Sequence, residues 1–253
     1  MNFTGKSAIV TGAASGMGLL FSENWAALGG NVAMCDVNEA GLNEKVAAIN
    51  EKGAGQAVSV LCDVRDYGQV CAARDVTLER FGRIDLVANF AGGSSVRIKQ
   101  VDMEKYPTFP DVPIEVFDWG LDVNLKGPFY FAHAVMKPMM EQKSGLILNI
   151  GSISGSEGGG YAPDYGTAKA GLMYNLTKSL AQCGASYGVR CVCISPGPVL
   201  TREAMANMKT LLGRAADPQE IVDLCLFVAS EKGQFINGTN LMIDGGREAM
   251  GRP

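Results

Sequence analysis

Short runs of almost continuously apolar residues recur along the chain. They are separated by longer stretches in which apolar residues fall every three or four positions. The short runs are typical of strands buried on both faces, and the longer pattern is typical of amphipathic helices. We expect strands at residues 7–10, 31–35, 57–61, 86–88, 145–150, 190–194 and 240–243. We expect helices at residues 18–28, 39–52, 67–81, 116–140, 165–187 and 218–229.

The alternation of strand and helix predicts the fold class. Right-handed strand–helix–strand crossovers build a parallel sheet with helices on both faces. The sequence therefore predicts an α/β protein with a single-domain, Rossmann-type, doubly wound parallel sheet of about seven strands. Neither an internal repeat nor an interdomain linker breaks the pattern, so residues 1–253 are interpreted as one domain.

Two connections depart from this rhythm. Residues 92–116 contain Pro107, Pro110 and Pro113, which exclude a regular helix there. A connection of this length is usually functional or solvated, and two interpretations stay open: a surface loop, or a lip over a substrate cleft. The second connection, residues 196–214, joins the sixth strand to the last long helix.

Composition narrows the class of protein. The chain has 253 residues, of which 47% are hydrophobic and 19% charged, and this favours a folded domain with a large core. The net charge is -4 and no basic stripe is present, so nucleic acid is not an expected partner. No apolar run reaches the ~20 residues of a membrane span, and residues 1–7 lack the apolar core of a signal peptide. We therefore expect no membrane association.

Cysteine and histidine usage indicates a reducing compartment. Seven cysteines are scattered without framework spacing, so reduced thiols and a cytoplasmic location are expected. Cys191 and Cys193 alternate within one predicted strand, where both would face the same side as small core residues. His133 is the single histidine and lies in a helical run, which argues against a metal site.

A glycine-rich turn follows the first predicted strand. Gly12, Gly16 and Gly18 let the backbone approach a pyrophosphate, which the N-terminus of the next helix would bind. Asp36 ends the second strand, where a carboxylate holds the ribose hydroxyls of NAD and repels the 2′-phosphate of NADP. The turn contains no arginine or lysine, so NAD(H) is the expected cofactor. An alternative takes Asp36 as a helix N-cap, with Asn38 as a competitor for that position.

Tyr165 and Lys169 lie on the same face of a predicted helix. A phenol has a pKa near ~10, and lowering that pKa to about 7 requires roughly 4 kcal/mol of differential stabilisation. Lys169 and the positive ring of an oxidised nicotinamide would supply it. This chemistry removes a proton from an alcohol while its hydride leaves. Taken alone, the pair is more typical of a surface tyrosine beside a solvated lysine.

Together these motifs resemble the short-chain dehydrogenase/reductase family in its compact, NAD-preferring form, over essentially the whole chain. The matching segments are residues 11–18, 63–64, 89–92, 196–201 and 244–246. The catalytic positions match Asn124, Ser152, Tyr165 and Lys169. The resemblance implies that the cofactor contacts Gly12, Ser15, Gly16, Met17, Gly18, Asp36, Asp63, Val64, Asn89, Ala91, Gly92, Tyr165, Lys169, Pro196, Gly197, Val199 and Thr201.

The resemblance implies an NAD-dependent alcohol dehydrogenase or ketone reductase with a small-molecule substrate. Tyr165 is expected to act as general acid/base and, with Ser152, to bind the substrate oxygen. Lys169 would lower the pKa of Tyr165 and bind the nicotinamide ribose, and Asn124 would hold a water that connects Lys169 to solvent. Members of the family often form tetramers, so a homotetramer or homodimer is expected, consistent with the apolar segment 235–243.

The chain also departs from the family pattern. Phe90 replaces the second asparagine of the 89–92 motif, which affects local packing more than chemistry, and Gly151 stands where a serine is usual. The 92–116 connection is longer than the family norm, and the 196–214 segment, which supplies the substrate lid in relatives, looks short. We therefore expect a substrate cleft formed by residues 93–116, 153–164 and 197–214.

The substrate class stays open. The glycines of residues 155–161 leave room for a bulky substrate such as a sugar, a polyol or a hydroxysteroid-like ring alcohol, and Glu157 is expected to meet a hydroxyl or a cation. One alternative is a ketoacyl-thioester reductase of the same family. Such enzymes usually prefer NADPH, so Asp36 argues against it. Another is a catalytically silent NAD-binding regulator, which usually lacks the tyrosine or the lysine.

Overall fold

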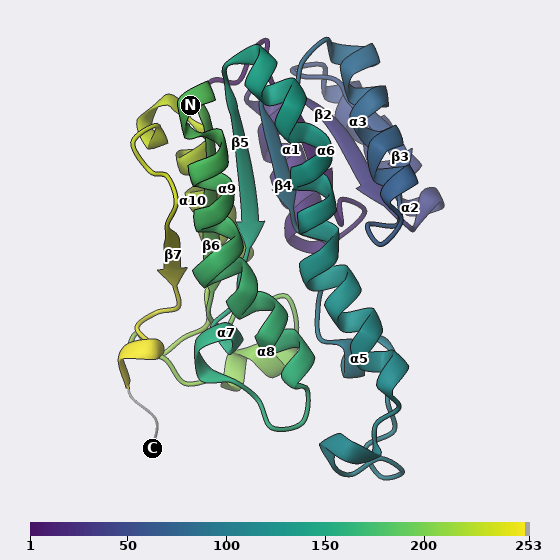
Figure 1. Cartoon of the computed structure of the whole chain (residues 1–253), viewed down its shortest axis with the longest axis vertical. Helices are drawn as coiled ribbons and strands as arrows, with labels where there is room; N and C mark the ends of the chain where they lie inside the picture. The colour runs from purple at the N-terminus through teal and green to yellow at the C-terminus, as the bar shows by residue number, and fades with distance from the viewer. Residues whose placement is uncertain (251–253) are drawn as a thin grey trace.

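The computed structural model describes residues 1–250, which contain one central sheet (Figure 1). Seven strands lie in the order β3-β2-β1-β4-β5-β6-β7, and every neighbouring pair is parallel. The predicted fold class is confirmed. The order reverses between β1 and β4, where doubly wound sheets open a crevice at the carboxyl ends of their strands. The strands are β1 (Ser7–Thr11), β2 (Asn31–Asp36), β3 (Ala57–Leu61), β4 (Leu86–Asn89), β5 (Gly145–Ile150), β6 (Val189–Pro196) and β7 (Asn240–Ile243).

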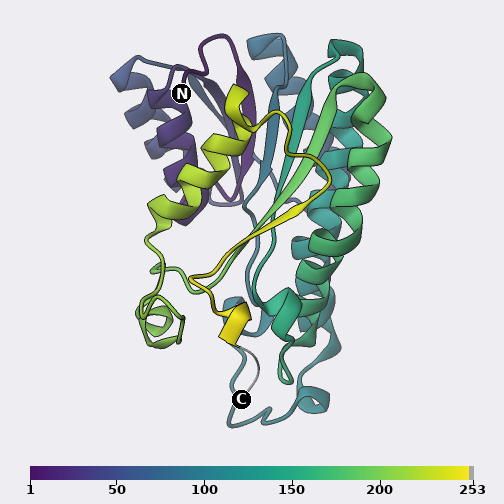
Figure 2. The same ribbon diagram turned by 90° about the vertical axis from the view of Figure 1, so that its left-hand side faces the viewer.

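Helices cover both faces of the sheet, as Figures 1 and 2 show from two directions. One layer contains α1 and its neighbours α2 and α10, and the other contains α3, α6 and α9. Three further helices, α5, α7 and α8, gather beyond the carboxyl ends of the strands, at the bottom of Figure 1. The helices of the two layers are α1 (Gly16–Ala27), α2 (Glu39–Lys52), α3 (Tyr67–Phe81), α6 (Gly127–Gln142), α9 (Thr177–Gly184) and α10 (Pro218–Ala229). The remaining ones are α4 (Ser95–Ile98), α5 (Ile114–Leu121), α7 (Ser154–Glu157) and α8 (Pro163–Ala170).

Two apolar layers hold these helices on the sheet. Successive residues of a buried strand point to opposite faces, so Val10 packs in the layer of α1, with Phe21 and Trp25. Its neighbour Ile9 packs in the layer of α6, with Phe131. All of these side chains are almost wholly buried. The continuous apolar runs of the sequence therefore correspond to strands covered on both sides.

The two long predicted helices are interrupted. The first begins at Ile114, directly after Pro113, and contains a π-helical turn at Asp122–Lys126 between α5 and α6. The second begins at Pro163 and contains a π-helical turn at Gly171–Leu176 between α8 and α9. A proline fits the first turn of a helix because its missing N–H is not needed there. The predicted starts at residues 116 and 165 were therefore two residues late.

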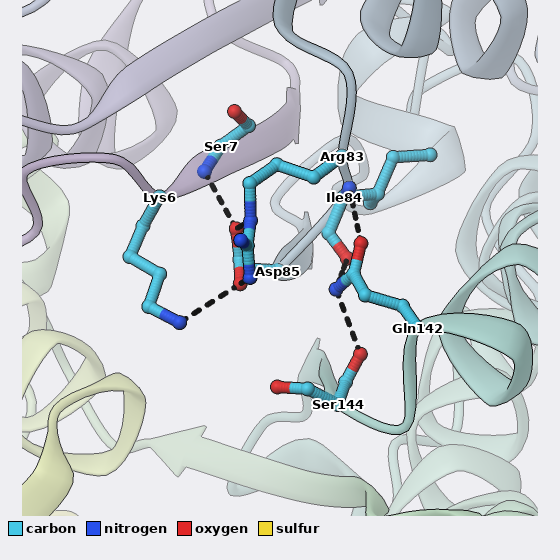
Figure 3. A network of polar contacts seen from close by, with 7 residues as sticks. All are labelled: Lys6, Ser7, Arg83, Ile84, Asp85, Gln142 and Ser144. Atoms are coloured by element: carbon cyan, nitrogen blue, oxygen red, sulfur yellow. Dashed lines mark hydrogen bonds and ion pairs between the residues drawn. The ribbon is translucent and has the colours of Figure 1, made fainter.

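A polar network joins the loops at the amino ends of the strands (Figure 3). The Asp85 carboxylate, just before β4, accepts hydrogen bonds from the Ser7 amide at 2.9 Å and the Lys6 ammonium at 3.2 Å. It also accepts two from the Arg83 guanidinium, at 2.6 and 2.7 Å. The Gln142 side chain bonds both the amide and the carbonyl of Ile84. The starts of β1 and β4 and the end of α6 are thereby tied together at the edge opposite the crevice.

The connection at residues 92–116 contains no long helix, as its prolines predict. It holds the short helix α4 and a 3-10 turn at Phe109–Asp111, and most residues between 97 and 111 are exposed. Two contacts anchor it beside α5 and α8. The Tyr161 hydroxyl donates to the Tyr106 carbonyl at 2.7 Å, and the Phe109 ring packs on Phe117 with centroids 5.2 Å apart.

The cysteines within residues 1–250 form no disulfide bonds. All seven cysteines are free thiols, and Cys191 and Cys193 on β6 are fully buried core residues, as predicted. No helix in this part of the chain has the length and apolar character needed to cross a membrane. The same residues include no group of three or more His, Cys, Asp or Glu side chains placed to hold a metal ion.

Candidate active site

A cavity of about 490 Å³ opens at the carboxyl ends of the strands, where the strand order reverses. It runs from the glycine turn after β1, past the ends of β2 and β3, to the segment that follows β6. Most residues predicted to bind the cofactor meet here. Those that line the cavity are Gly12, Ser15, Gly16, Met17, Gly18, Asp36, Asp63, Val64, Ala91, Gly92 and Thr201.

The glycine turn is shaped for the close approach of a ligand. Gly12 has a φ of 65°, and a Cβ on it would lie 3.0 Å from the backbone of Ala91. A Cβ on Gly18 would lie 2.3 Å from the carbonyl oxygen of Gly12. Ser15 precedes α1 without a capping hydrogen bond from its side chain, so the amides of the first helical turn are available to an anion. The cradle fits the pyrophosphate of a dinucleotide.

Asp36 is fixed at the edge of this cavity. One of its oxygens accepts a hydrogen bond from the Ala14 amide in the glycine turn, and the other accepts one from the Asn38 amide, both at 3.0 Å. The N-cap of α2 is Asn38, whose side chain accepts from the Gly41 amide. The alternative that made Asp36 the N-cap is therefore wrong. The Asp36 carboxylate connects the turn that cradles phosphates with the end of β2, where a ribose would lie.

Asp63 lines the cavity in an ion pair. The Arg65 guanidinium donates from Nε to both carboxylate oxygens, at 2.9 and 3.0 Å. These hydrogen bonds lower the pKa of Asp63 below its ordinary value. The predicted contact of Asp63 with an adenine amino group remains a prediction. Because both carboxylate oxygens already bond Arg65, that amino group would share an acceptor with the guanidinium.

Lys169 is buried beneath the far end of the cavity. Its Nζ donates to the carbonyl of Ile150, the last residue of β5, at 2.7 Å. Burial lowers the pKa of Lys169 from 10.5 to about 8. Its Nζ lies 5.6 Å from the centroid of the Tyr165 ring. A Cβ on Gly92, which lines the cavity, would lie 3.6 Å from the same Nζ. The lysine therefore adjoins both the phenol and the cavity wall.

The charges near Tyr165 include two arginines to which the sequence analysis gave no role. Burial raises the pKa of the phenol above its ordinary value. Three groups oppose this rise and lower the pKa: the Ser152 hydroxyl through a side-chain hydrogen bond, and the charges of Arg202 and Arg97. Two arginines therefore add positive charge near the phenol, whose ring centroid also lies 5.6 Å from the Lys169 ammonium.

Asn124 holds the cavity wall in place. Its side-chain amide donates to the carbonyls of Gly120, at 2.8 Å, and Gly93, at 3.0 Å, and its oxygen accepts from the Gly93 amide at 2.9 Å. It lies in the first π-helical turn, a distortion that often marks functional sites. These bonds use three of the four that an asparagine side chain can make. One acceptor position is left for the water that the resemblance assigns to Asn124.

Several predicted residues lie outside the cavity lining, among them the catalytic candidates Asn124, Ser152, Tyr165 and Lys169. Asn89 is buried in β4, where its side chain donates to Asn149 at 2.9 Å. Val199 is buried beside the sheet, and Gly197 packs so tightly that a Cβ would lie 2.6 Å from Cα of Asp244. Pro196 ends β6, so these residues shape the backbone that leads to Thr201. Glu157, predicted to meet substrate, forms an ion pair with Arg247 at 2.7 Å.

Other residues line the cavity without having been assigned a role. Arg97, Ile98 and Trp119 come from α4 and α5, and the Lys99 ammonium lies 4.9 Å from the centroid of the Trp119 ring. Phe90 also lines the cavity and packs on Phe21, with ring centroids 5.4 Å apart. The first part of the 92–116 connection therefore forms a wall of the cavity, and its outer part is the solvated loop. The many charged and aromatic side chains between residues 97 and 109 were the feature of the sequence that could have predicted this wall.

Comparisons with known proteins agree with this geometry. The sequence profile described as Enoyl-(Acyl carrier protein) reductase matches residues 12–248. D-threitol dehydrogenase of Mycolicibacterium smegmatis is 34% identical over 96% of this chain and 92% of that protein. The structure of NAD+-bound xylitol dehydrogenase matches 97% of this chain and 100% of its own, with a TM-score of 0.86 and 28% identity. A 3-oxoacyl-[acyl-carrier protein] reductase from Brucella melitensis with bound NAD matches 96% and 91%, with a TM-score of 0.85 and 28% identity.

The sheet topology, the glycine cradle and these similarities define an oxidoreductase of the Rossmann type that acts on alcohols and ketones. The chain belongs to the short-chain dehydrogenase/reductase family.

Proposed function

We propose that the protein is an NAD(H)-dependent oxidoreductase that interconverts a secondary alcohol and its ketone, with Tyr165 as general acid/base. The observation that carries this proposal is that Tyr165, Ser152 and Lys169 are neighbours and that Lys169 adjoins Gly92 of the cavity wall. The glycine cradle and Asp36 occupy the other end. NAD+, when bound, supplies the hydride acceptor and a positive charge near the phenol.

The side chains then have distinct tasks in alcohol oxidation. Tyr165, as phenolate, accepts the hydroxyl proton, and Ser152 donates a hydrogen bond to the substrate oxygen as charge develops on it. Lys169 carries the proton onward, because its pKa of about 8 lets it exchange protons near neutral pH. Asn124 holds the Gly93 wall and, through a water, connects Lys169 to solvent. In ketone reduction the same proton path runs in reverse.

The decisive experiment replaces Tyr165 with phenylalanine. NADH appearance at 340 nm is measured across sugars, polyols, hydroxysteroids and simple secondary alcohols. The wild type is expected to turn over one of these groups. Tyr165→Phe is expected to lose turnover by a factor of ~10² or more, as removal of a general base predicts. NADH affinity, measured by fluorescence, should stay within about twofold. The exposed Tyr187 gives a control, since Tyr187→Phe should leave both quantities unchanged. Turnover that survives in Tyr165→Phe would refute the role of the phenol.

Preference for NAD over NADP is the second part of the proposal. Two NAD-bound structures among the similar proteins support it, and so does the fixed carboxylate of Asp36. Asp36→Ala removes the repulsion of a 2′-phosphate, and Asp36→Asn does so while it keeps an acceptor oxygen. Both should lower the ratio of kcat/KM for NAD to that for NADP by roughly 10-fold or more, the factor that corresponds to about 1.4 kcal/mol. An unchanged ratio in both variants would exclude Asp36 as the selecting residue.

A ketoacyl-thioester reductase is the second candidate, because one of the similar structures is a 3-oxoacyl-[acyl-carrier protein] reductase. That structure holds NAD, so the cofactor by itself does not separate the two candidates. Reduction of a 3-oxoacyl thioester by NADH, run beside the alcohol panel, does separate them. A polyol substrate is supported by similarity to the threitol and xylitol dehydrogenases.

A further inference from the structure

Two arginines approach the catalytic end of the cavity from different connections. Arg97 of α4 lines the cavity, and its Nη2 lies 3.0 Å from the position of a Cβ on Gly93. Gly93 is the residue that Asn124 holds through two backbone hydrogen bonds. The guanidinium of Arg97 therefore lies beside the catalytic asparagine, on the wall formed by the 92–116 connection.

Arg202 comes from the segment after β6. Its neighbour Thr201 lines the same cavity as Arg97. Partial burial lowers the pKa of Arg97, and the charge of the nearby Arg202 guanidinium lowers it further. The charges of both also reach the phenol of Tyr165, whose pKa they lower. Arg97, Arg202 and Tyr165 are thus neighbours in one electrostatic environment.

Neither arginine is neutralised by the protein within residues 1–250. No carboxylate of this part of the chain forms an ion pair with Arg97 or Arg202. The Nη2 of Arg202 donates to the sulfur of Met205 at 3.4 Å. By contrast, two other arginines, in or near the 196–214 segment, have acidic partners. Arg214 pairs with Glu220 at 2.6 Å, and Arg247 pairs with Glu157 at 2.7 Å. The positive charge beside Tyr165 is therefore local and uncompensated.

Such an arrangement favours an anion. Two like charges brought together repel each other, and an anion placed between them removes the repulsion. Guanidinium groups also match the paired oxygens of a carboxylate, sulfonate or phosphate through two parallel hydrogen bonds. A neutral polyol has no charged group that would pair with the two guanidinium groups.

We infer that the substrate is a secondary alcohol or ketone that also carries an anionic group, and that Arg97 and Arg202 bind this group while the reacting oxygen meets Ser152 and Tyr165. The inference rests on the proposed function, since it assigns the substrate class of the same site. The pyrophosphate of the cofactor is the competing anion. The amides of the glycine turn and of the first turn of α1 already provide for it.

The test measures binding separately from turnover. Dissociation constants for the NAD+-saturated protein are determined by calorimetry for matched pairs that differ only in charge. Suitable pairs are butanoate with butanamide and cyclohexanecarboxylate with cyclohexanecarboxamide, with methanesulfonate and methyl phosphate as further anions. At least one anion should bind roughly 10- to 100-fold more tightly than its neutral partner, as expected for charge-assisted hydrogen bonds. The rank among carboxylate, sulfonate and phosphate then identifies the group.

Variants locate the anion. Arg97→Gln and Arg202→Gln should each weaken binding of the anionic member by about 10-fold and leave the neutral member unchanged. Arg97→Lys should keep part of the preference, because it keeps the charge and loses the fork. Lys209→Gln removes an exposed charge from the same lid and should change nothing. Equal affinity for both members of every pair would overturn the inference. So would an Arg97→Gln variant that loses NADH affinity and keeps its anion preference, because Arg97 would then serve the cofactor.

Turnover separates this inference from the proposed function. Hydroxy acids such as 3-hydroxybutyrate and 4-hydroxycyclohexanecarboxylate are compared with their amides at 340 nm. Higher kcat/KM for the acids, lost in Arg97→Gln, supports both ideas. Faster oxidation of the amides leaves the oxidoreductase intact and refutes the anionic substrate. Anion preference in the calorimeter without any turnover supports the anion site and counts against the proposed reaction.

Discussion

Lys169 shows how burial sets the properties of a catalytic group. Lys169 is 4% exposed, and its ammonium donates a hydrogen bond to one backbone carbonyl, that of Ile150. The folded-state pKa is about 8, against an ordinary value of 10.5. Between these two values the unfolded chain holds a proton that the folded chain has released. Stability must therefore rise with pH across this window, whereas below pH 8 both states are protonated and the cost of burying the charge is constant.

This gives a measurable difference between wild type and Lys169→Met. The free energy of unfolding of the wild type, relative to the variant, should rise by about 2–3 kcal/mol between pH 7 and pH 10.5. Urea unfolding of both proteins at several pH values measures it, and the subtraction removes the titration of other groups. Parallel pH profiles would mean that folding does not lower the pKa of Lys169.

At single positions, some roles could be predicted from the sequence and others could not. Tyr165, Lys169 and the glycine turn were recognisable because their chemistry depends on short spacing along the chain. Gly151 was noted only as a departure from the family, but a Cβ there would lie 2.1 Å from Oγ of Ser195, which bonds Asn240. That requirement comes from a strand neighbour far away in sequence. The meeting of Arg97 with Arg202 is of the same kind, because it depends on how two connections fold over one cavity.

At the scale of elements, buried strands were predicted well and helix irregularities were not. The strands at residues 57–61, 145–150 and 240–243 have the predicted bounds, because each is a short apolar run. The central strand at 145–150 is buried on both faces, as such a run predicts. The π-helical turn at Asp122–Lys126 leaves no such trace. There the Asn124 side chain bonds the Gly120 carbonyl, and hydrophobic periodicity does not report a rearranged hydrogen-bond ladder.

The Asp85 network gives a prediction about how elements are joined. Its carboxylate is 8% exposed and accepts from Lys6, Ser7 and Arg83 at the amino ends of β1 and β4. Asp85→Ala removes all of these hydrogen bonds, and we expect a loss of about 2–3 kcal/mol in the free energy of unfolding, as for hydrogen bonds to charged groups. Urea denaturation measures this loss.

Loss of the Asp85 network should lower stability without changing cofactor binding. The network lies at the amino ends of β1 and β4 (Figure 3), whereas the cavity lies at the carboxyl ends of the strands, so NADH affinity below the unfolding transition should be unchanged in Asp85→Ala. Asp75→Ala, which breaks an exposed pair with Arg74, is the matched control and should cost less than 1 kcal/mol. Equal losses of unfolding free energy in the two variants would show that the Asp85 network stabilises the fold no more than an exposed ion pair does.

For the whole molecule, the remaining question is assembly. β7 is the last strand of the sheet and pairs only with β6 among the described strands. Such an edge presents unpaired backbone groups, and proteins usually cover it. Beside it lies Phe235, whose side chain is fully exposed, and Phe227 of α10 is 39% exposed. Exposed aromatic residues near a free sheet edge are typical of a surface that meets another copy of the chain.

We therefore predict a homotetramer or homodimer that depends on this surface. Light scattering coupled to gel filtration should give a mass of two or four times the 26.7 kDa of the chain. Phe235→Asp places a charge at the exposed aromatic position and should shift the mass toward a smaller species, whereas Met103→Asp, at another exposed apolar position on the 92–116 connection, should not. A wild-type mass of one chain would exclude the assembly. A stable oligomer in Phe235→Asp would place the interface on another face, where the exposed Phe129 of α6 is the next position to test.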